Sequence, residues 1–249
     1  MEKSSVALLG VFATALVAVT TSAVLAQPRA VIELFTSQGC SSCPPADQLL
    51  GELGEDPSII TLSLPISYWD YLGWKDTLAI PGHSNRQRAY SRQRGDREVY
   101  TPQAIIDGSA QVLGSDRVAI EDAIEQTRKH PEVLTLPVSL AVASGQITVT
   151  APAKILGTGE VWLCSLSKAV PVIINRGENR GRTITYHNVV RRWSKLGDWD
   201  GAAATWTLPV TDVEGDDVDA VMVMVQAGNA QNPGSILGAA MAPLTAATH

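Results

Sequence analysis

The chain has 249 residues, of which 45% are hydrophobic, and carries a formal net charge of −6. This mildly acidic balance does not indicate nucleic-acid binding, because phosphate binding depends on an excess of clustered Lys and Arg. The three cysteines are odd in number and too few for a small fold held together by disulfides.

The first 26 residues have the layout of a secretory signal peptide. A charged start precedes an uncharged apolar run from Val6 to Val19, and Val24 and Ala26 place small side chains before a cut. The alternative is an uncleaved membrane anchor, since about 20 apolar residues span a bilayer, but no basic cluster follows. We therefore expect a secreted or periplasmic protein with a mature chain of residues 27–249 and no later membrane span.

Strand-like and helix-like segments alternate over residues 27–132. Apolar residues at helical spacing predict helices, the apolar run 59–66 is typical of a parallel strand buried on both faces, and Asp107-Gly108 is a strong hairpin turn signal. The expected elements are a strand at 31–36, a helix at 43–54, a strand at 59–66, a helix at 84–94, a hairpin of 103–106 with 111–113, and a helix capped by Ser115 that ends before Pro131. This order predicts a sheet covered by helices.

The helical signals stop after Pro131. Eight segments punctuated by Gly, Pro, Asn and Asp are expected to be strands, at residues 138–143, 147–151, 161–166, 170–174, 183–190, 203–208, 220–226 and 236–241. Short strands at this spacing predict an antiparallel β-sandwich. We therefore expect an α/β domain at residues 27–132 and an all-β domain at 133–249.

The sequence CSSC at residues 40–43 is the main candidate for chemistry. A helix beginning just after Cys40 would direct its N–H groups and dipole at that sulfur, which favours the thiolate. Cys43, one turn later, is then placed to attack a mixed disulfide on Cys40. A zinc site uses the same spacing but needs two further ligands, and the only other cysteine is Cys164. Strand alternation puts Cys164 between Trp162 and Leu166, as a buried hydrophobe without a redox role.

The segment VIELFTSQGCSSCP and the Thr101-Pro102 pair that opens the hairpin resemble thioredoxin-like oxidoreductases over about residues 30–130. With SYWDYLGWKD, RQRAY, VYTPQAIIDG and GENRGRTITYHNVVR, the chain closely resembles one secreted thioredoxin-like family, known only as domain of unknown function 1223. The resemblance implies a thioredoxin-like βαβαββα domain and a cis bond at Thr101-Pro102 that presents an extended substrate to the cysteines. The chain departs from typical thioredoxins at Gly39, where Trp usually precedes the first cysteine, and in the long insertion at residues 67–82.

Two further groups are candidates for the same site. Glu33 in the first strand resembles the buried acid of thioredoxins, although one residue off the usual spacing, and burial would raise its pKa and suit it to shuttle protons for Cys43. The alternative is a Glu on the exposed face of the strand. Trp69, Tyr71 and Trp74 in the insertion are expected either to contact substrate, with Thr101, or to anchor the long loop by packing.

Two charged segments are open to two interpretations. A run of arginines forms either an electropositive collar that favours a thiolate or a solvated helix face; its members are Arg86, Arg88, Arg92, Arg94 and Arg97. The loop RGENRGR at residues 176–182 is expected to be a structural hairpin loop, because its two glycines favour a turn. The alternative is that its dense charges form a network or a partner site.

The leading hypothesis is an exported thiol-disulfide oxidoreductase for protein or peptide substrates, without a soluble cofactor or bound metal. Cys40 attacks, Cys43 resolves and Pro102 presents the substrate. A second hypothesis is a copper(I)-handling module in which His83 or His187 joins the two thiolates. A third is a binding or assembly protein in which the pair is only a structural disulfide. The sequence predicts neither the redox direction nor the oligomeric state.

The exported protein should begin at Gln27, because the apolar run ends at a site with small residues before the cut. Intact-mass analysis of the exported protein measures this directly. A membrane-bound product that retains residues 1–26 would contradict cleavage.

Overall fold

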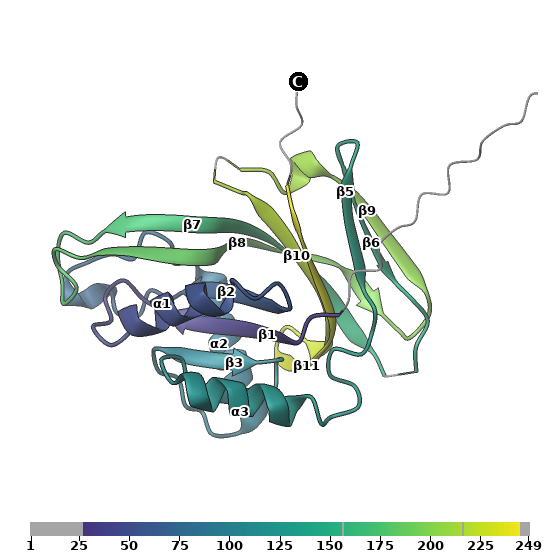
Figure 1. The fold of residues 1–249 in the computed structure, drawn as a ribbon, viewed down its shortest axis with the longest axis horizontal. Helices are drawn as coiled ribbons and strands as arrows, with labels where there is room; N and C mark the ends of the chain where they lie inside the picture. Colours follow the sequence, from purple (N-terminus) through teal and green to yellow (C-terminus); the bar gives the residue numbers. More distant parts are fainter. Residues whose placement is uncertain (1–26, 156, 216, 245–249) are drawn as a thin grey trace, which may run out of the picture.

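The computed structural model describes residues 27–155, 157–215 and 217–244, so the expected signal peptide lies outside the described residues. The fold is a mixed α/β arrangement of one eight-stranded sheet, a second three-stranded sheet and few helices (Figure 1). Within the described ranges, no helix is both long and apolar enough to cross a membrane.

The first half of the chain has the predicted order of strands and helices. The elements are β1 (Ala30–Thr36), α1 (Pro44–Leu53), β2 (Ile59–Pro65), the short 3-10 helix η1 (Asp70–Leu72), α2 (Pro81–Arg94), β3 (Gln103–Ile106), β4 (Ala110–Leu113) and α3 (Arg117–Thr127). Asp107 and Gly108 both have positive φ in the β3–β4 turn, as a tight hairpin requires. The expected cap of α3 at Ser115 is wrong: Asp116 caps this helix, and its carboxylate accepts from the Ala119 N–H.

The second half contains fewer and longer strands than expected. They are β5 (Ser139–Ala143), β6 (Gln146–Ala151), β7 (Gly159–Ile173), β8 (Thr183–Trp199), β9 (Ala204–Pro209), β10 (Ala220–Asn229) and β11 (Asn232–Pro243), with the 3-10 helix η2 (Val210–Asp212) between β9 and β10. The two strands expected at 161–166 and 170–174 are one strand, β7. Its Pro171 is tolerated because β7 pairs with β10 only as far as Leu166, so no partner on that side needs the missing N–H.

The two halves share one sheet, which the sequence did not predict. The strand order is β11-β10-β7-β8-β2-β1-β3-β4, and β2 joins β8 in parallel at Ser63 and Val189. The strands β7, β8, β10 and β11, which contain five of the segments expected in a separate sandwich, therefore extend the first sheet. Among the described residues, β5, β6 and β9 form the second sheet. Just after the expected boundary between residues 132 and 133, the N–H groups of Leu134 and Leu136 donate to carbonyls of β11. The boundary therefore marks a change in sequence pattern, while the large sheet continues across both halves of the chain.

The large sheet is covered on both faces. On β10, Met222 and Met224 face the core under α2, whereas Val221 and Val223 face the layer formed by the three-stranded sheet. At the other end of this second face, β1 and β3 pack against α1 and α3. Figure 1 shows the three-stranded sheet on the right of the molecule, α1 in the left half and α3 along the bottom. The strict alternation follows from the pleat of the strands, which sends successive side chains to opposite faces.

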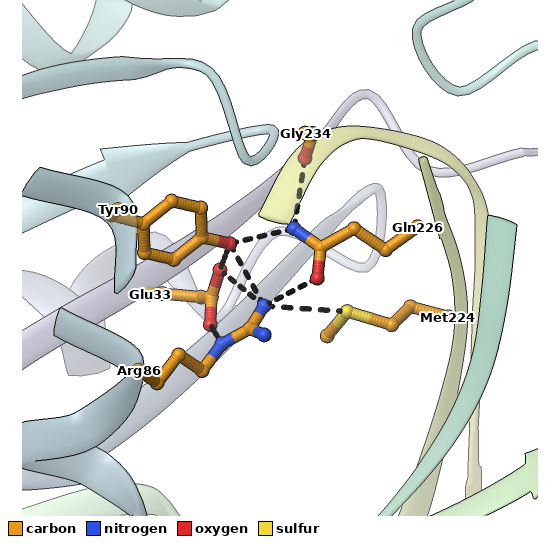
Figure 2. Close-up of polar contacts among 6 residues, drawn as sticks. All are labelled: Glu33, Arg86, Tyr90, Met224, Gln226 and Gly234. Atoms are coloured by element: carbon orange, nitrogen blue, oxygen red, sulfur yellow. Dashed lines mark hydrogen bonds and ion pairs between the residues drawn. The ribbon is translucent and has the colours of Figure 1, made fainter. Parts of the chain in front are cut away.

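A buried polar network lies between β1, α2 and β10 (Figure 2). Glu33 is fully buried and accepts from Arg86 Nε at 2.5 Å and from the Tyr90 hydroxyl at 2.5 Å. Arg86 also donates to Gln226 Oε1 at 2.9 Å, and Gln226 Nε2 donates to the Gly234 carbonyl at 2.8 Å. Burial opposes the charge of Arg86, but Glu33 outweighs burial and raises the pKa of the guanidinium. The network therefore holds an ion pair in the core and links the two halves of the chain.

Replacement of Arg86 by Met should reduce the free energy of unfolding by about 3–5 kcal/mol, because it leaves the Glu33 carboxylate buried without its cation. The double variant Glu33→Met/Arg86→Met should lose less than the sum of the two single variants, since no unpaired charge remains. Urea unfolding of the three variants and the native protein gives the coupling. Additive losses, or an Arg86→Met loss below about 1 kcal/mol, would show that the ion pair does not fix this core.

Candidate functional site

Cys40 and Cys43 form a disulfide with a Cα–Cα distance of 5.4 Å. The Cys40 N–H donates to the Ser37 carbonyl at 3.1 Å, and the Cys43 N–H donates to the Cys40 carbonyl at 3.2 Å. Cys43 has no exposed surface and Cys40 is 3% exposed, so the first cysteine is the more accessible one by a small margin.

The expectation that a helix begins directly after Cys40 is wrong. Helix α1 begins at Pro44, with Cys43 as its N-cap, and its first two residues are prolines without an N–H. The helix dipole and free N–H groups therefore do not single out the Cys40 sulfur. The role of Cys40 as the attacked or attacking sulfur rests on its accessibility and on the groups beside it.

The Thr101-Pro102 loop lies against Cys40. The peptide bond between these residues is cis, as predicted, and the Thr101 carbonyl oxygen lies 3.8 Å from Cys40 Sγ. Trp69 Nε1 donates to the Thr101 hydroxyl at 2.7 Å. A Cβ on Gly39 would come within 3.1 Å of Trp69, so the glycine allows Trp69 to lie against the CSSC turn.

The aromatic residues of the insertion divide into two groups. Tyr71 is 75% exposed and stacks on Trp69, with ring centroids 6.1 Å apart, so this pair lies at the surface beside the cis proline. Trp74 instead donates from Nε1 to Gln38 Oε1 at 2.8 Å and packs against Gly177. The position of Trp74 fits the packing interpretation, and the positions of Trp69 and Tyr71 fit substrate contact.

A residue of the second half holds the CSSC turn. Asn179, from the RGENRGR loop, is fully buried and donates from Nδ2 to the carbonyls of Gln38 at 3.0 Å and Cys40 at 2.8 Å. The Gln38 N–H donates to Asp76 Oδ2 at 2.8 Å. Burial raises the pKa of Asp76 to about 6, while backbone donors such as Gln38 oppose this increase. The RGENRGR loop, for which a structural hairpin was the favoured interpretation, is thus part of the site, and its dense charges did not single out Asn179 for this role.

Glu33 does not occupy the position expected of a proton shuttle for Cys43. Its neighbours on β1, Ile32 and Leu34, face α1, and strand alternation sends Glu33 to the opposite face, where it pairs with Arg86. Because α1 carries Cys43 at its start, Glu33 and Cys43 lie on opposite faces of the sheet.

Asp47 is a buried acid one helical turn after Cys43, and the sequence analysis missed it. It lies four residues after Cys43, its N–H donates to the Cys43 carbonyl at 3.1 Å, and it is 2% exposed. Residues four apart share a helix face, with Cβ atoms about 5–6 Å apart. Among the described residues, neither carboxyl oxygen has a hydrogen-bond partner. Burial raises the pKa of Asp47 well above its usual value; the nearby Thr36 hydroxyl offsets part of this increase without making a well-formed hydrogen bond.

The arginines of the run differ from one another. Arg86 belongs to the buried network, and Arg94 forms an ion pair with Asp96 at 2.8 Å. Arg88, Arg92 and Arg97 are exposed. The run is therefore neither a uniform collar nor a uniform solvated face.

The remaining cysteine and the two histidines lie in other surroundings. Cys164 is a free, fully buried thiol in the core under α2, and burial raises its pKa, so it stays protonated. His83 is buried, bonds through Nδ1 to the Pro65 carbonyl at 2.8 Å, and has a pKa lowered by burial to about 4. His187 packs against Gly51 of α1. In the part of the chain that the structure describes, no three His, Cys, Asp or Glu side chains are grouped as metal ligands.

Sequence similarity assigns this chain to a protein family. The family described as "protein of unknown function (DUF1223)" matches residues 31–226, and the chain belongs to this family. A crystal structure of a protein from Agrobacterium tumefaciens is 33% identical, with a TM-score of 0.78 over 87% of this chain and 94% of that one. HBP35 of Porphyromonas gingivalis is similar in fold, with 15% identity and a TM-score of 0.59 over 90% of this chain and 78% of that one. No curated protein matches the chain.

The Asp47→Asn variant tests whether this acid is buried in its protonated form. The ordinary pKa of an Asp side chain is 3.8. Above this pH the folded protein keeps a proton on Asp47 that the unfolded chain releases, so this carboxyl reduces the free energy of unfolding as pH rises toward its raised pKa. The variant lacks this titration. Its free energy of unfolding, relative to the native protein, should therefore increase as pH rises from about 4 to 8.

Asp56→Asn is the matched control, because a hydrogen bond from Ser58 lowers the pKa of Asp56. This control should lose stability relative to the native protein as pH rises through about 4, which is the opposite sign. Denaturant unfolding at several pH values measures both variants. A pH-independent difference for Asp47→Asn would show that the Asp47 pKa is not raised.

Proposed function

We propose that this protein is an exported thiol-disulfide oxidoreductase that acts on polypeptide thiols and disulfides through Cys40 and Cys43, on a thioredoxin-like scaffold. The observation that supports this most is the position of the Cys40–Cys43 disulfide against the Thr101 carbonyl, next to a cis proline. An extended substrate can pair with backbone groups at this loop while its sulfur approaches Cys40.

The exchange proceeds through a mixed disulfide and is reversible. When the substrate is oxidised, its thiolate attacks Cys40 Sγ, the Cys40–Cys43 bond breaks, and Cys43 leaves as a thiolate. A second substrate thiolate then attacks the substrate sulfur of the mixed disulfide and releases the Cys40 thiolate. Two electrons pass from the substrate to the protein. In the reverse direction the Cys40 thiolate opens a substrate disulfide, and Cys43 closes the protein disulfide.

Asp47 is suited to supply or accept the proton that accompanies the Cys43 step. Cys43 is fully buried, so a thiolate formed there is costly unless a proton reaches it. A carboxyl with a raised pKa one turn away donates a proton to the leaving thiolate in one direction. In the other direction, the same group as a carboxylate is a stronger base than an ordinary Asp.

One observation favours the rival interpretation of a binding or assembly protein with a structural disulfide, because both sulfurs are largely covered. The metal-handling alternative has no comparable support, since the described residues bring neither His83 nor His187 into a three-ligand group. Reactivity of the disulfide therefore separates the two remaining interpretations.

The Cys43→Ser variant should capture substrate proteins as mixed disulfides on Cys40, because the resolving thiol is absent. Cys40→Ser should capture few, since the remaining Cys43 is fully buried. Purification from the exported protein fraction, followed by non-reducing gels and mass spectrometry of the Cys40 peptide, measures capture. Cys164→Ala is the matched control: this thiol is buried away from the site, so exchange should be unchanged and only stability should fall.

Capture by Cys40→Ser at the level of Cys43→Ser would contradict the assigned roles. If neither variant captures a partner and the native disulfide resists small dithiols, the structural interpretation holds instead.

A further inference from the structure

Three arginines on α2 and just after it lack an ion-pair partner among the described residues. Arg88, Arg92 and Arg97 are exposed, and the described residues provide no ion-pair partner for any of them. By contrast, Arg86 and Arg94 in the same segment each pair with a carboxylate. The three positive charges therefore face solvent in a protein whose net charge is −6.

These side chains gather around one hollow in the surface. Arg88 and Arg92 are four residues apart on α2, so they lie on the same face of the helix, where like charges repel. With Ser91, Gly95 and Arg97 they line a hollow of about 510 Å³. None of the five lining residues is acidic; the neighbouring acids are Asp96, which is paired with Arg94, and the exposed Glu98. A group of like charges of this kind is complementary to a ligand with negative charges.

The helix that carries Arg88 is linked to the cis-proline loop, and through it to the proposed reactive sulfur, by a neighbouring residue. Gln87, the neighbour of Arg88, donates from Nε2 to the Tyr100 carbonyl at 2.8 Å, and the next carbonyl, of Thr101, lies 3.8 Å from Cys40 Sγ. Burial raises the pKa of Tyr68, and the nearby Arg88 opposes this increase. The ring of Tyr68 lies 6.0 Å from that of Trp69, which bonds to Thr101. Arg88 and the aromatic residues Tyr68 and Trp69 thus lie near the same loop.

We propose that Arg88, Arg92 and Arg97 form a binding surface for acidic side chains of the substrate polypeptide, close in sequence to its reacting cysteine. This inference rests on the proposed function and names the substrate class. Guanidinium groups bind carboxylates in a bidentate manner, and a local positive surface on an acidic protein steers acidic segments toward Cys40 and disfavours basic ones.

The test uses two synthetic peptides with one cysteine each, activated as a mixed disulfide with thionitrobenzoate. One peptide has Asp and Glu beside the cysteine, and the other has Lys at the same positions. The reduced Cys43→Ser protein reacts with each: the Cys40 thiolate attacks the peptide sulfur and releases coloured thionitrobenzoate. At low salt the acidic peptide should react about tenfold faster, and the difference should shrink as salt screens the charges.

Arg88→Gln/Arg97→Gln in the same background should abolish most of the preference for the acidic peptide. Arg128→Gln is the control, because this exposed arginine lies at the end of α3, beside Arg29 at the start of β1 and away from the cis-proline loop. It should leave the preference unchanged. An uncharged small disulfide should react at the same rate with all three proteins, which shows that Cys40 chemistry is intact.

Equal rates for the two peptides, or a preference that survives Arg88→Gln/Arg97→Gln, would overturn this inference while the small disulfide still reacts and the proposed function stands. Failure of the small disulfide to react would instead overturn the proposed function. Binding of the native protein to anionic lipid vesicles through these arginines, without a peptide preference, would assign the surface to a membrane and contradict the proposal.

Discussion

The buried ion pair between Glu33 and Arg86 is the interaction on which the arrangement of the site depends. It fixes α2 against the large sheet, and it also links β1 to β10 through Gln226 (Figure 2). With Arg86 held, the next residue, Gln87, is placed to bond to the Tyr100 carbonyl, which positions the cis-proline loop beside Cys40. An ion pair in the core is costly to break, because each remaining charge would be buried alone. The site is thus held in place by buried residues that take no part in its chemistry.

The candidate site belongs to both halves of the chain. The disulfide and the cis proline come from the first half. Asn179, which donates to the carbonyls of Gln38 and Cys40, comes from the loop between β7 and β8. The family match over residues 31–226 spans both halves, in agreement with a fold in which β8 joins β2 within one sheet. The second half therefore supports the CSSC turn as well as carrying the three-stranded sheet.

Features that depend on local sequence were predictable, and features that depend on which faces meet were not. The order of strands and helices in the first half, the turn at Asp107 and the burial of Cys164 follow from spacing and residue type. The role of Glu33 was misassigned because a shift of one residue along a strand reverses the face of the side chain. Asp47 was missed because nothing in its sequence neighbourhood shows that this side chain would be buried. The continuous sheet was missed because pairing between distant strands leaves no local signal in the sequence.

The reduction potential of the Cys40–Cys43 pair tests the central claim most directly. The measurement is equilibration of the native protein in thiol-disulfide buffers of known potential, with the fraction of reduced protein determined by alkylation and mass spectrometry. The account predicts a single reversible two-electron transition above about −300 mV, in the range of exchanging disulfides. A potential below about −300 mV, or a disulfide that opens only when the protein unfolds, would contradict it and identify the pair as a structural crosslink.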